Sequence, residues 1–413
     1  MAKASCDPKQ HFLSFRFHLK IRCAVNIAIL SYMHYKSVIC CAAKMAQIVL
    51  ENTRRNEQYV LEHLREAFGG LPQVEASEPV VERLDSGSQY RIDAEMRLDV
   101  GGRNIVLLIE VKKSVYPRDV RQILWQLDRY VHREGVEHGA SNIPFLAAES
   151  ISQGARELLR HENVGYYDTG GSLYVPAPGA YIFVEKPPPK TLEKSVRSLF
   201  KGKRAQIVHT LLVKRGEWFG ATALAEIAEV APSTASETLI SLERYDWLES
   251  RGQGPAKERR LIAPTALLDE WSKQVQATRL RGERRYYVPR GEPDTIIRRL
   301  AAACREHEVS YVITREAAAQ RYSPFLSALS QVACRMKPGS AAEEALAELG
   351  ARSVGEGANL NVIETPTSGE FLFKERVDDA WLASPVQVYL DLLTGEGRSR
   401  EMAAHLRHER IGF

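Results

Sequence analysis

The middle of the chain reads PSTASETLISLERYDWLESRGQGPAKERRLI from Pro232 to Ile262. Ala235, Leu239 and Leu242 recur at i, i+4 and i+7, the spacing of one apolar helix face. Pro232 suits the first turn of such a helix, where no N–H partner is lost. Strand-like residues then flank a glycine-rich turn at 251–255. The stretch therefore predicts a helix followed by a β-hairpin.

Two further helices are expected ahead of this one, over 203–214 and 222–228. Small hydroxyl residues at the start of the third helix can approach phosphates and base edges closely, and basic residues on the hairpin can contact phosphates. The residues expected to contact double-stranded DNA are Ser233, Thr234, Ser236, Glu237, Ser241 and Arg244 on the helix, and Arg251, Lys257, Arg259 and Arg260 on the hairpin.

This order of three helices and a basic hairpin resembles the winged-helix family of bacterial regulators. We place the winged helix-turn-helix domain at 200–275. Two other interpretations stay open: a helical bundle with a solvated charged hairpin, or a winged helix that contacts only proteins.

A second hairpin is expected between residues 89 and 112. The strand at 89–98 alternates, with Ile92, Ala94, Met96 and Leu98 on one face and charged residues on the other. If Gly101 and Gly102 form a two-residue turn, Asp93 lies opposite Glu110 on the returning strand. Two facing carboxylates repel each other, so a cation is expected between them. Lys112 shares the face of Glu110.

The pattern Asp93, then Glu110-Val111-Lys112, resembles the PD-(D/E)XK nuclease superfamily. The resemblance implies a restriction-endonuclease-like α/β/α domain in which Asp93, Glu110 and the Val111 carbonyl hold Mg²⁺. Lys112 would position or help deprotonate the attacking water, and Gln126 with Tyr130 matches a Gln-xxx-Tyr pair of some branches. The preceding proline of the superfamily is absent, and many such domains have lost catalysis. The alternative is a charged, solvent-facing strand beside a buried one.

The organisation expected for the whole chain is an α/β multidomain protein. Pro187-Pro188-Pro189 marks a stiff linker. In the last third, strands are expected at 311–314 and 370–374, and helices at 341–349 and 385–393. The expected segments are an unstructured extension or misassigned start at 1–44, a nuclease-like domain at 45–186, a Pro-rich linker at 187–199, the winged helix at 200–275 and a mixed α/β domain at 285–413.

The end of the chain carries a further resemblance. SPVQVYLDLLTGEGR from Ser384, followed by EMAAHLR to Arg407, resembles the end of AbiEi-type antitoxins of type IV toxin–antitoxin systems. The resemblance runs from the winged helix onward. It implies a repressor of its own operon whose toxin is a nucleotidyltransferase-like protein that it opposes without a stable complex. The alternative to this resemblance is that residues 385–393 simply form an amphipathic helix of the core.

The composition of the chain bears on its partners, its metal sites and its cellular location. The 413 residues carry a net charge of +4, too little by itself to indicate a nucleic-acid partner. Four of the six cysteines fall in the first 41 residues and no CxxC pair occurs, so neither a disulfide framework nor a zinc site is expected. We expect a cytoplasmic protein without a membrane span. A homodimer stays open, although no heptad pattern marks an interface.

Three functions remain from the sequence. The first is a DNA-binding regulator of the antitoxin type. The second is a Mg²⁺-dependent DNA endonuclease that uses Asp93, Glu110, Lys112 and Gln126 and is targeted by its winged helix. The third is a protein-interaction scaffold.

Overall fold

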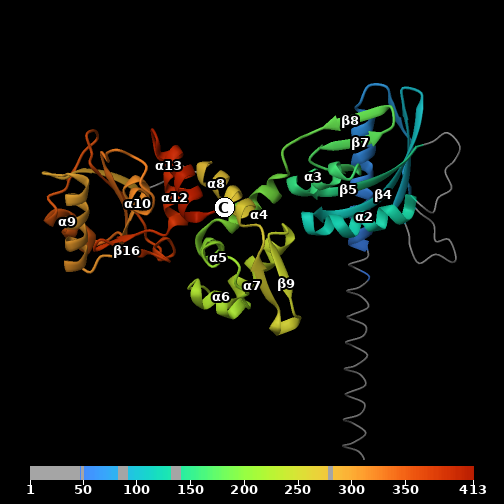
Figure 1. Ribbon diagram of the computed structural model, residues 1–413. Helices are drawn as coiled ribbons and strands as arrows, with labels where there is room; N and C mark the ends of the chain where they lie inside the picture. The colour runs from blue at the N-terminus through green and yellow to red at the C-terminus, as the bar shows by residue number, and fades with distance from the viewer. Residues whose placement is uncertain (1–46, 48–50, 82–91, 132–140, 278–281) are drawn as a thin grey trace, which may run out of the picture. The chain divides into compact units, whose positions relative to one another are not determined.

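The computed structural model describes residues 47, 51–81, 92–131, 141–277 and 282–413 (Figure 1). The expected extension at 1–44 lies outside the described residues, as do Tyr90 and Arg91 of the strand expected at 89–98. The chain has a mixed α/β architecture. No helix in this described part of the chain is long and apolar enough to cross a membrane.

The described residues fall into two compact units. Of these residues, the first unit contains 47, 51–81, 92–113, 127–131, 141–149 and 164–185, and the second contains 114–126, 150–163, 186–277 and 282–413.

The first unit is built on a mostly antiparallel sheet with the order β1-β3-β4-β5-β6-β7-β8, in which β2 also pairs with β3. A helix over residues 51–69, drawn in blue in Figure 1, packs Val60, Leu64 and Phe68 against the apolar residues of one sheet face. The strands are β1 (Val74–Ala76), β2 (Val80–Val81), β3 (Ala94–Val100), β4 (Arg103–Val115), β5 (Ser141–Ile151), β6 (Gly165–Asp168), β7 (Leu173–Ala177) and β8 (Ala180–Val184).

Strand β4 is buried on both faces, as its continuous apolar run from Ile105 implies. Ile105, Leu107 and Ile109 join the core beneath the helix over 51–69. The side chains between them point to the opposite face, where Glu110 is also buried. The sheet therefore holds the Glu110 carboxylate away from water.

The second unit contains the remaining helices. Residues 117–126 of α2 (Pro117–Val131) belong to it, as does α3 (Gln153–His161). The others are α4 (Lys190–Leu199), α5 (Gly202–Val213), α6 (Ala221–Ile227), α7 (Pro232–Arg244), α8 (Pro264–Gln276), α9 (Pro293–Glu306), α10 (Arg315–Tyr322), α11 (Ser340–Glu348), α12 (Pro385–Leu392) and α13 (Ser399–Leu406), followed by the π-helical turn η3 (Arg407–Ile411).

Two sheets complete this unit. One is the two-stranded hairpin β9 (Leu248–Arg251) and β10 (Glu258–Leu261), joined through the 3₁₀ turn η1 (Gly254–Ala256). The other has the order β14-β11-β15-β13-β12-β17-β16. Its strands are β11 (Glu283–Tyr287), β12 (Tyr311–Thr314), β13 (Val332–Met336), β14 (Arg352–Ser353), β15 (Leu360–Glu364), β16 (Glu375–Val377) and β17 (Ala380–Leu382).

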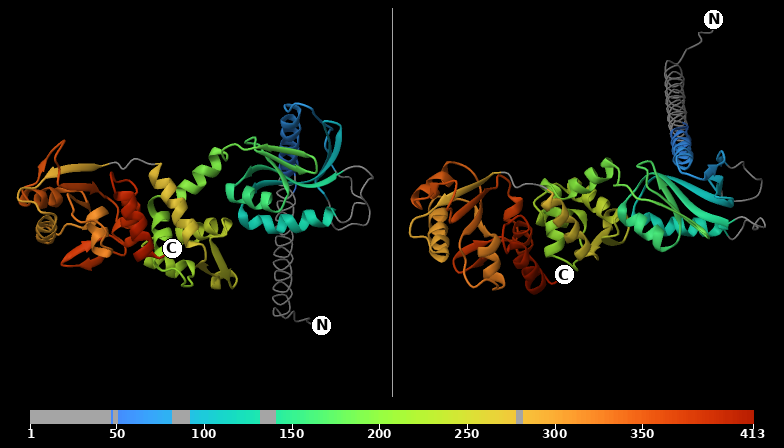
Figure 2. Two further views of the ribbon diagram at one scale, coloured as in Figure 1. Left: turned by 45° about the horizontal axis from the view of Figure 1, so that its top comes forward. Right: turned by 90° about the horizontal axis from the view of Figure 1, so that it is seen from above.

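A single hydrophobic core runs through the second unit from α4 and α5 to the last helix. His209 of α5 and Ser384, the N-cap of α12, are joined by a hydrogen bond of 2.6 Å. Ser272 of α8 donates to the Tyr389 hydroxyl at 3.3 Å. Helices α12 and α13, drawn in red in Figure 2, lie side by side in this core. The helical segment in the middle of the chain is therefore fixed to the C-terminal segment by buried contacts.

Most of the expected secondary structure of the last third is confirmed, with β12, α11 and α12 within one residue of their predicted bounds. The strand expected at 370–374 is wrong. That segment forms the 3₁₀ turn η2 (Gly369–Phe371), and Phe373 adopts a left-handed φ of 57° that an extended strand excludes. The linker expected at 187–199 is helical from Lys190, because Leu192 and Leu199 bury an apolar side against the rest of the unit.

A buried ion pair lies at the centre of the C-terminal sheet. Asp391 of α12 accepts hydrogen bonds from both ends of the Arg335 guanidinium, at 2.9 and 2.6 Å, and further bonds from Thr314 and Gln387. Burial acts to raise the pKa of Asp391, but the Arg335 charge and these hydrogen bonds outweigh it and hold that pKa below its ordinary value. Strands β12 and β13 and helix α12 therefore depend on one carboxylate.

We predict that Asp391→Ala lowers the free energy of unfolding by ~3–5 kcal/mol, because it leaves the buried Arg335 charge without a partner. Urea unfolding followed by circular dichroism measures the loss. Glu401→Ala is the control, since its ion pair with Arg398 is exposed and should contribute less than about 1 kcal/mol. Equal effects of the two substitutions would contradict this account.

Candidate functional site

Helices α5, α6 and α7 and the hairpin β9–β10 form the first candidate site. The predicted helix bounds are confirmed to within about one residue. Pro232 occupies the first turn of α7, as expected, and Glu229 in the preceding turn adopts a left-handed φ of 53°. Ala235, Leu239 and Leu242 face the core. The apolar spacing of the sequence therefore identified the inner face of α7.

The outer face of α7 carries the polar residues proposed to read DNA. Ser233, Glu237 and Arg244 are exposed, whereas Thr234, Ser236 and Ser241 are half-buried. Exposed Ile240 interrupts this polar stripe. Glu237 is paired with Arg204 of α5 at 3.2 Å, and Arg244 lies 5.6 Å from the centroid of the Tyr116 ring. All six residues occur on one helix, but their exposure differs.

The hairpin has the strand–turn–strand order predicted from its glycines. Glu258 pairs with Arg251, and Arg260 with Glu249, in an antiparallel register. Gly252 has a φ of 73°, and a Cβ there would lie 2.6 Å from the Ala256 carbonyl oxygen. This close approach requires glycine. An isolated bridge between Phe219 and Arg259 adds a third backbone segment beside the hairpin.

Arg259 is the one predicted DNA contact that the structure corrects. It is only 7% exposed, and its Nε donates to Glu243 at 3.1 Å. The reason is the strand alternation: Arg259 points toward α7, whereas its neighbours Glu258 and Arg260 point away. Its guanidinium is thus part of the core and is not presented to a phosphate.

Glu243 of α7 gathers three cations. Lys257 lies 2.8 Å, Arg259 3.1 Å and Arg118 3.2 Å from its carboxylate oxygens. Burial acts to raise the pKa of Glu243, but hydrogen bonds from Lys257 and Arg259 and their charges outweigh it and lower the pKa below its ordinary value. The carboxylate is therefore ionised and fastens the hairpin to α7.

Two cations, the exposed Arg251 and the half-buried Arg260, flank the half-buried Trp218. Their guanidinium carbons lie 4.4 and 4.8 Å from the centroid of its ring. Arg251 also pairs with Glu258 at 2.6 Å, and Arg260 pairs with Glu249. Sequence reasoning missed Trp218. Its position directly before Phe219, which bridges to the hairpin, is the signal that could have indicated it.

The second candidate site lies on β3 and β4. The predicted register is confirmed where β3 is regular, with Val100 opposite Arg103 and Ala94 opposite Ile109. Asp93 directly precedes β3 and accepts a hydrogen bond from the Val111 N–H at 2.8 Å. Glu110 is 3% exposed, forms an ion pair with Lys112 and accepts a bond from the Tyr130 hydroxyl at 3.3 Å.

The charge balance at Glu110 is unfavourable to its ionised form. Burial, and then the Asp93 carboxylate, raise the pKa of Glu110, and the hydrogen bonds and charge of Lys112 only partly oppose them. The sequence predicted this repulsion and the need for a cation, and Lys112 supplies one positive charge. Gln126 lies in the second unit, on the turn of α2 before Tyr130.

The fit to a metal ion can be tested from the donor chemistry. Asp93, Glu110 and the Val111 carbonyl offer oxygen, which Mg²⁺ prefers. Within the described ranges, no cluster of three or more acidic, histidine or cysteine side chains could hold a metal. The donor type fits Mg²⁺, but only two carboxylates are present to hold it.

Comparison with known proteins was informative for one part of the chain. Residues 260–411 match the family model described as a transcriptional regulator, AbiEi antitoxin, of type IV toxin–antitoxin systems. The matched region begins within β10 and ends at the final π-helical turn. No curated protein and no solved structure matched the chain. Similarity to an antitoxin regulator thus rests on the C-terminal part.

The contribution of Glu243 to the free energy of unfolding depends on pH. Because its pKa is lowered on folding, Glu243 contributes stability above the ordinary glutamate pKa of ~4.3, and this contribution is lost as the pH falls through the folded value. We predict that Glu243→Gln lowers the free energy of unfolding at pH 7 by about 2–3 kcal/mol. The difference from the unsubstituted protein should shrink below about pH 4.

Urea unfolding between pH 7 and pH 3 checks this prediction. Glu237→Gln is the matched control on the same helix, since the ion pair of Glu237 with Arg204 is largely exposed. A Glu243→Gln effect that stays constant over the whole pH range would show that the charge of Glu243 is not what holds the hairpin.

Proposed function

We propose that the chain is a DNA-binding transcriptional regulator of the antitoxin type that represses its own operon. The match of residues 260–411 to AbiEi antitoxin regulators carries the proposal. The matched region shares a core with helices α5–α7. The proposed reading head therefore belongs to the same folded unit as the region that resembles the antitoxins.

The DNA-binding part of the proposal rests on the arrangement of α5–α7 and the hairpin, which we interpret as a winged helix-turn-helix. Helix α7 would enter the major groove and β9–β10 would act as the wing. Arg244 and Arg251 are exposed, and Arg260 and Lys257 are partly exposed. Arg244, Arg251 and Arg260 are suited to phosphate contacts, whereas Lys257 lies beside Glu243. Arg259 is left out because it is buried.

The setting of the proposed regulator follows from the same similarity. We propose a cytoplasmic protein whose toxin is a nucleotidyltransferase-like product of a neighbouring gene, opposed without a stable complex. A homodimer on a two-fold symmetric operator is the proposed binding form, since a winged helix reads only a short site.

We predict that the triple variant Arg244→Ala, Arg251→Ala, Arg260→Ala weakens binding to the upstream region of its own gene roughly tenfold or more at 0.1 M salt. The slope of log affinity against log salt should become shallower by about 3, one for each lost phosphate contact. Fluorescence anisotropy with labelled duplex measures both quantities.

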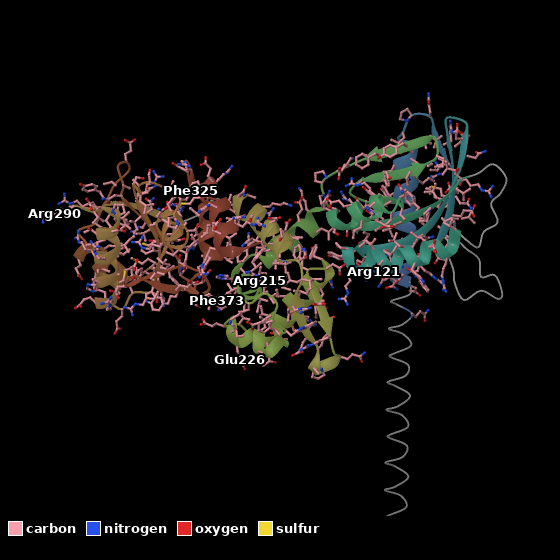
Figure 3. The ribbon with its side chains drawn as sticks, viewed as in Figure 1. Arg121, Arg215, Glu226, Arg290, Phe325 and Phe373 are labelled. Atoms are coloured by element: carbon pink, nitrogen blue, oxygen red, sulfur yellow. The ribbon has the colours of Figure 1, made fainter. Side chains whose placement is uncertain are left out.

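A matched control removes three exposed arginines elsewhere: Arg290→Ala, Arg298→Ala and Arg305→Ala (Arg290 is labelled in Figure 3). It changes net charge equally but should leave the salt slope unchanged. An equal loss of DNA affinity in the two triple variants would show that binding depends on net charge and not on the positions of these arginines. If the unsubstituted protein does not bind duplex DNA at low salt, the scaffold interpretation is favoured.

One observation favours a second function, that of a Mg²⁺-dependent DNA endonuclease. Asp93 and Lys112 both lie beside the buried carboxylate of Glu110. Asp93, Glu110 and the Val111 carbonyl would hold the ion, which would stabilise charge on the phosphate. Lys112 would orient the water.

The expected outcome for this second function is Mg²⁺-dependent nicking of supercoiled plasmid that both Asp93→Asn and Lys112→Ala abolish. Glu95→Gln is the control, because Glu95 is a partly buried carboxylate on the same strand that pairs with Arg97. Absence of nicking in the unsubstituted protein, or nicking that survives both substitutions, would exclude these residues as a nuclease site.

A further inference from the structure

A cavity of about 570 Å³ opens between the start of α5 and the C-terminal sheet, within the second unit. Its walls come from α4, α5 and α8 on one side and from β13, β15, η2 and α12 on the other. This is a volume typical of small-molecule sites. Neither the proposed DNA contacts nor the carboxylates of the first unit take part in it.

The mouth of the cavity is basic. Arg197, Lys201 and Lys203 line it and are exposed. Lys201 is the N-cap of α5, makes no side-chain cap, and no acidic residue occupies the first turn. Cations at a helix N-terminus oppose the helix dipole, whereas an anion there is stabilised by the free N–H groups. The local charge thus favours an anionic ligand.

The acidic side chains of the lining are already engaged. Asp391 is paired with Arg335, Glu364 lies 3.3 Å from Arg284, and Glu370 accepts from Thr367 at 2.6 Å. In contrast, Arg197 and Lys201 make no ion pair with any residue that the structure describes. The Thr367 hydroxyl does not neutralise Glu370, so the lining holds four cationic side chains against three carboxylates and its net charge is +1.

A buried amide points to a second ligand group. Gln206 lines the cavity one turn inside α5, is only 5% exposed, and its Oε1 has no hydrogen-bond partner among the described residues. A Cβ at Gly369 would lie 2.6 Å from the Gln206 Nε2, so η2 can approach this amide only through glycine. A buried acceptor without a donor is costly, and a ligand N–H would satisfy it.

The inner walls are aromatic. Phe200 and Trp271 stack on each other with centroids 5.9 Å apart, and His209 contacts Trp271 edge-on. Phe373, labelled in Figure 3, is not part of the lining and contacts His209 edge-on, with ring centroids 5.3 Å apart. Burial lowers the pKa of His209 to about 4, so this wall is uncharged near neutral pH. A flat aromatic group suits these walls.

We propose that this cavity binds a mononucleotide. The phosphate lies at the N-terminus of α5 between Arg197 and Lys201, and the base lies against the Phe200–Trp271 wall. The Gln206 amide rotates toward the cavity, and an N–H group of the base donates to its Oε1. This site goes beyond the proposed repressor function and does not depend on it, because occupancy can be measured without DNA.

Isothermal titration calorimetry of the full chain with AMP, GMP, CMP and UMP tests the proposal. At least one should bind with a Kd of about 10–100 μM. Inorganic phosphate and the matching nucleoside should each bind at least tenfold more weakly. No binding by any of the four at concentrations up to about 5 mM would overturn the proposal. Phosphate that binds as tightly as the nucleotide would overturn it too.

Three variants locate the ligand. Lys201→Ala and Arg197→Ala should each weaken nucleotide binding about fivefold or more. Gln206→Met keeps the side-chain length but removes the acceptor, so it should weaken binding by a similar factor without lowering the melting temperature. Lys194→Ala, an exposed position on α4 outside the cavity, is the charge-matched control. A loss as large in Lys194→Ala as in Lys201→Ala would overturn the assignment.

Discussion

The buried carboxylate of Glu243 is the interaction on which the candidate DNA-binding surface depends. It connects the last turn of α7 to β10 through Arg259 and Lys257, and to the start of α2 through Arg118. A two-stranded hairpin has little stability of its own. The orientation of the hairpin relative to α7 is therefore set by one ionised side chain together with the Phe219–Arg259 backbone bridge.

This arrangement divides the cations of the hairpin into two kinds. Lys257 and Arg259 are held by a buried partner, whereas Arg251 and Arg260 pair with partly exposed glutamates beside the Trp218 ring. Surface ion pairs contribute little free energy, so a phosphate can replace Glu258 or Glu249 at small cost. Trp218 meanwhile limits the rotamers of both arginines. The hairpin can thus present Arg251 and Arg260 in fixed orientations while Lys257 and Arg259 hold it to α7.

Local sequence patterns allowed part of the fold and of the two candidate sites to be predicted. The alternation from Ile92 to Leu98 and the glycines at 101 and 102 give the register that brings Asp93 beside Glu110, because both signals act within one hairpin. The spacing of Ala235, Leu239 and Leu242 likewise gives the inner face of α7.

Features that depend on distant contacts could not be predicted in the same way. The inward direction of Arg259 is set by its alignment with Phe219 and Glu243, which no local period encodes. The 370–374 segment reads as a strand, yet Phe373 turns back to pack on His209. The cavity lining combines residues near 200, Trp271 and residues beyond 330, so only the folded unit brings them together.

Glu243 and Glu110 are both buried, but the charges around them differ. Glu243 and Glu110 are almost equally buried, and burial acts to raise the pKa of each. Glu243 has several cations around it, and its pKa falls. Glu110 has one lysine and a second carboxylate, Asp93, and its pKa rises. The negative charge of Glu243 is thus balanced by cations of the same unit. At Glu110, burial and the Asp93 carboxylate outweigh the single charge of Lys112, whereas at Glu243 the surrounding cations outweigh burial.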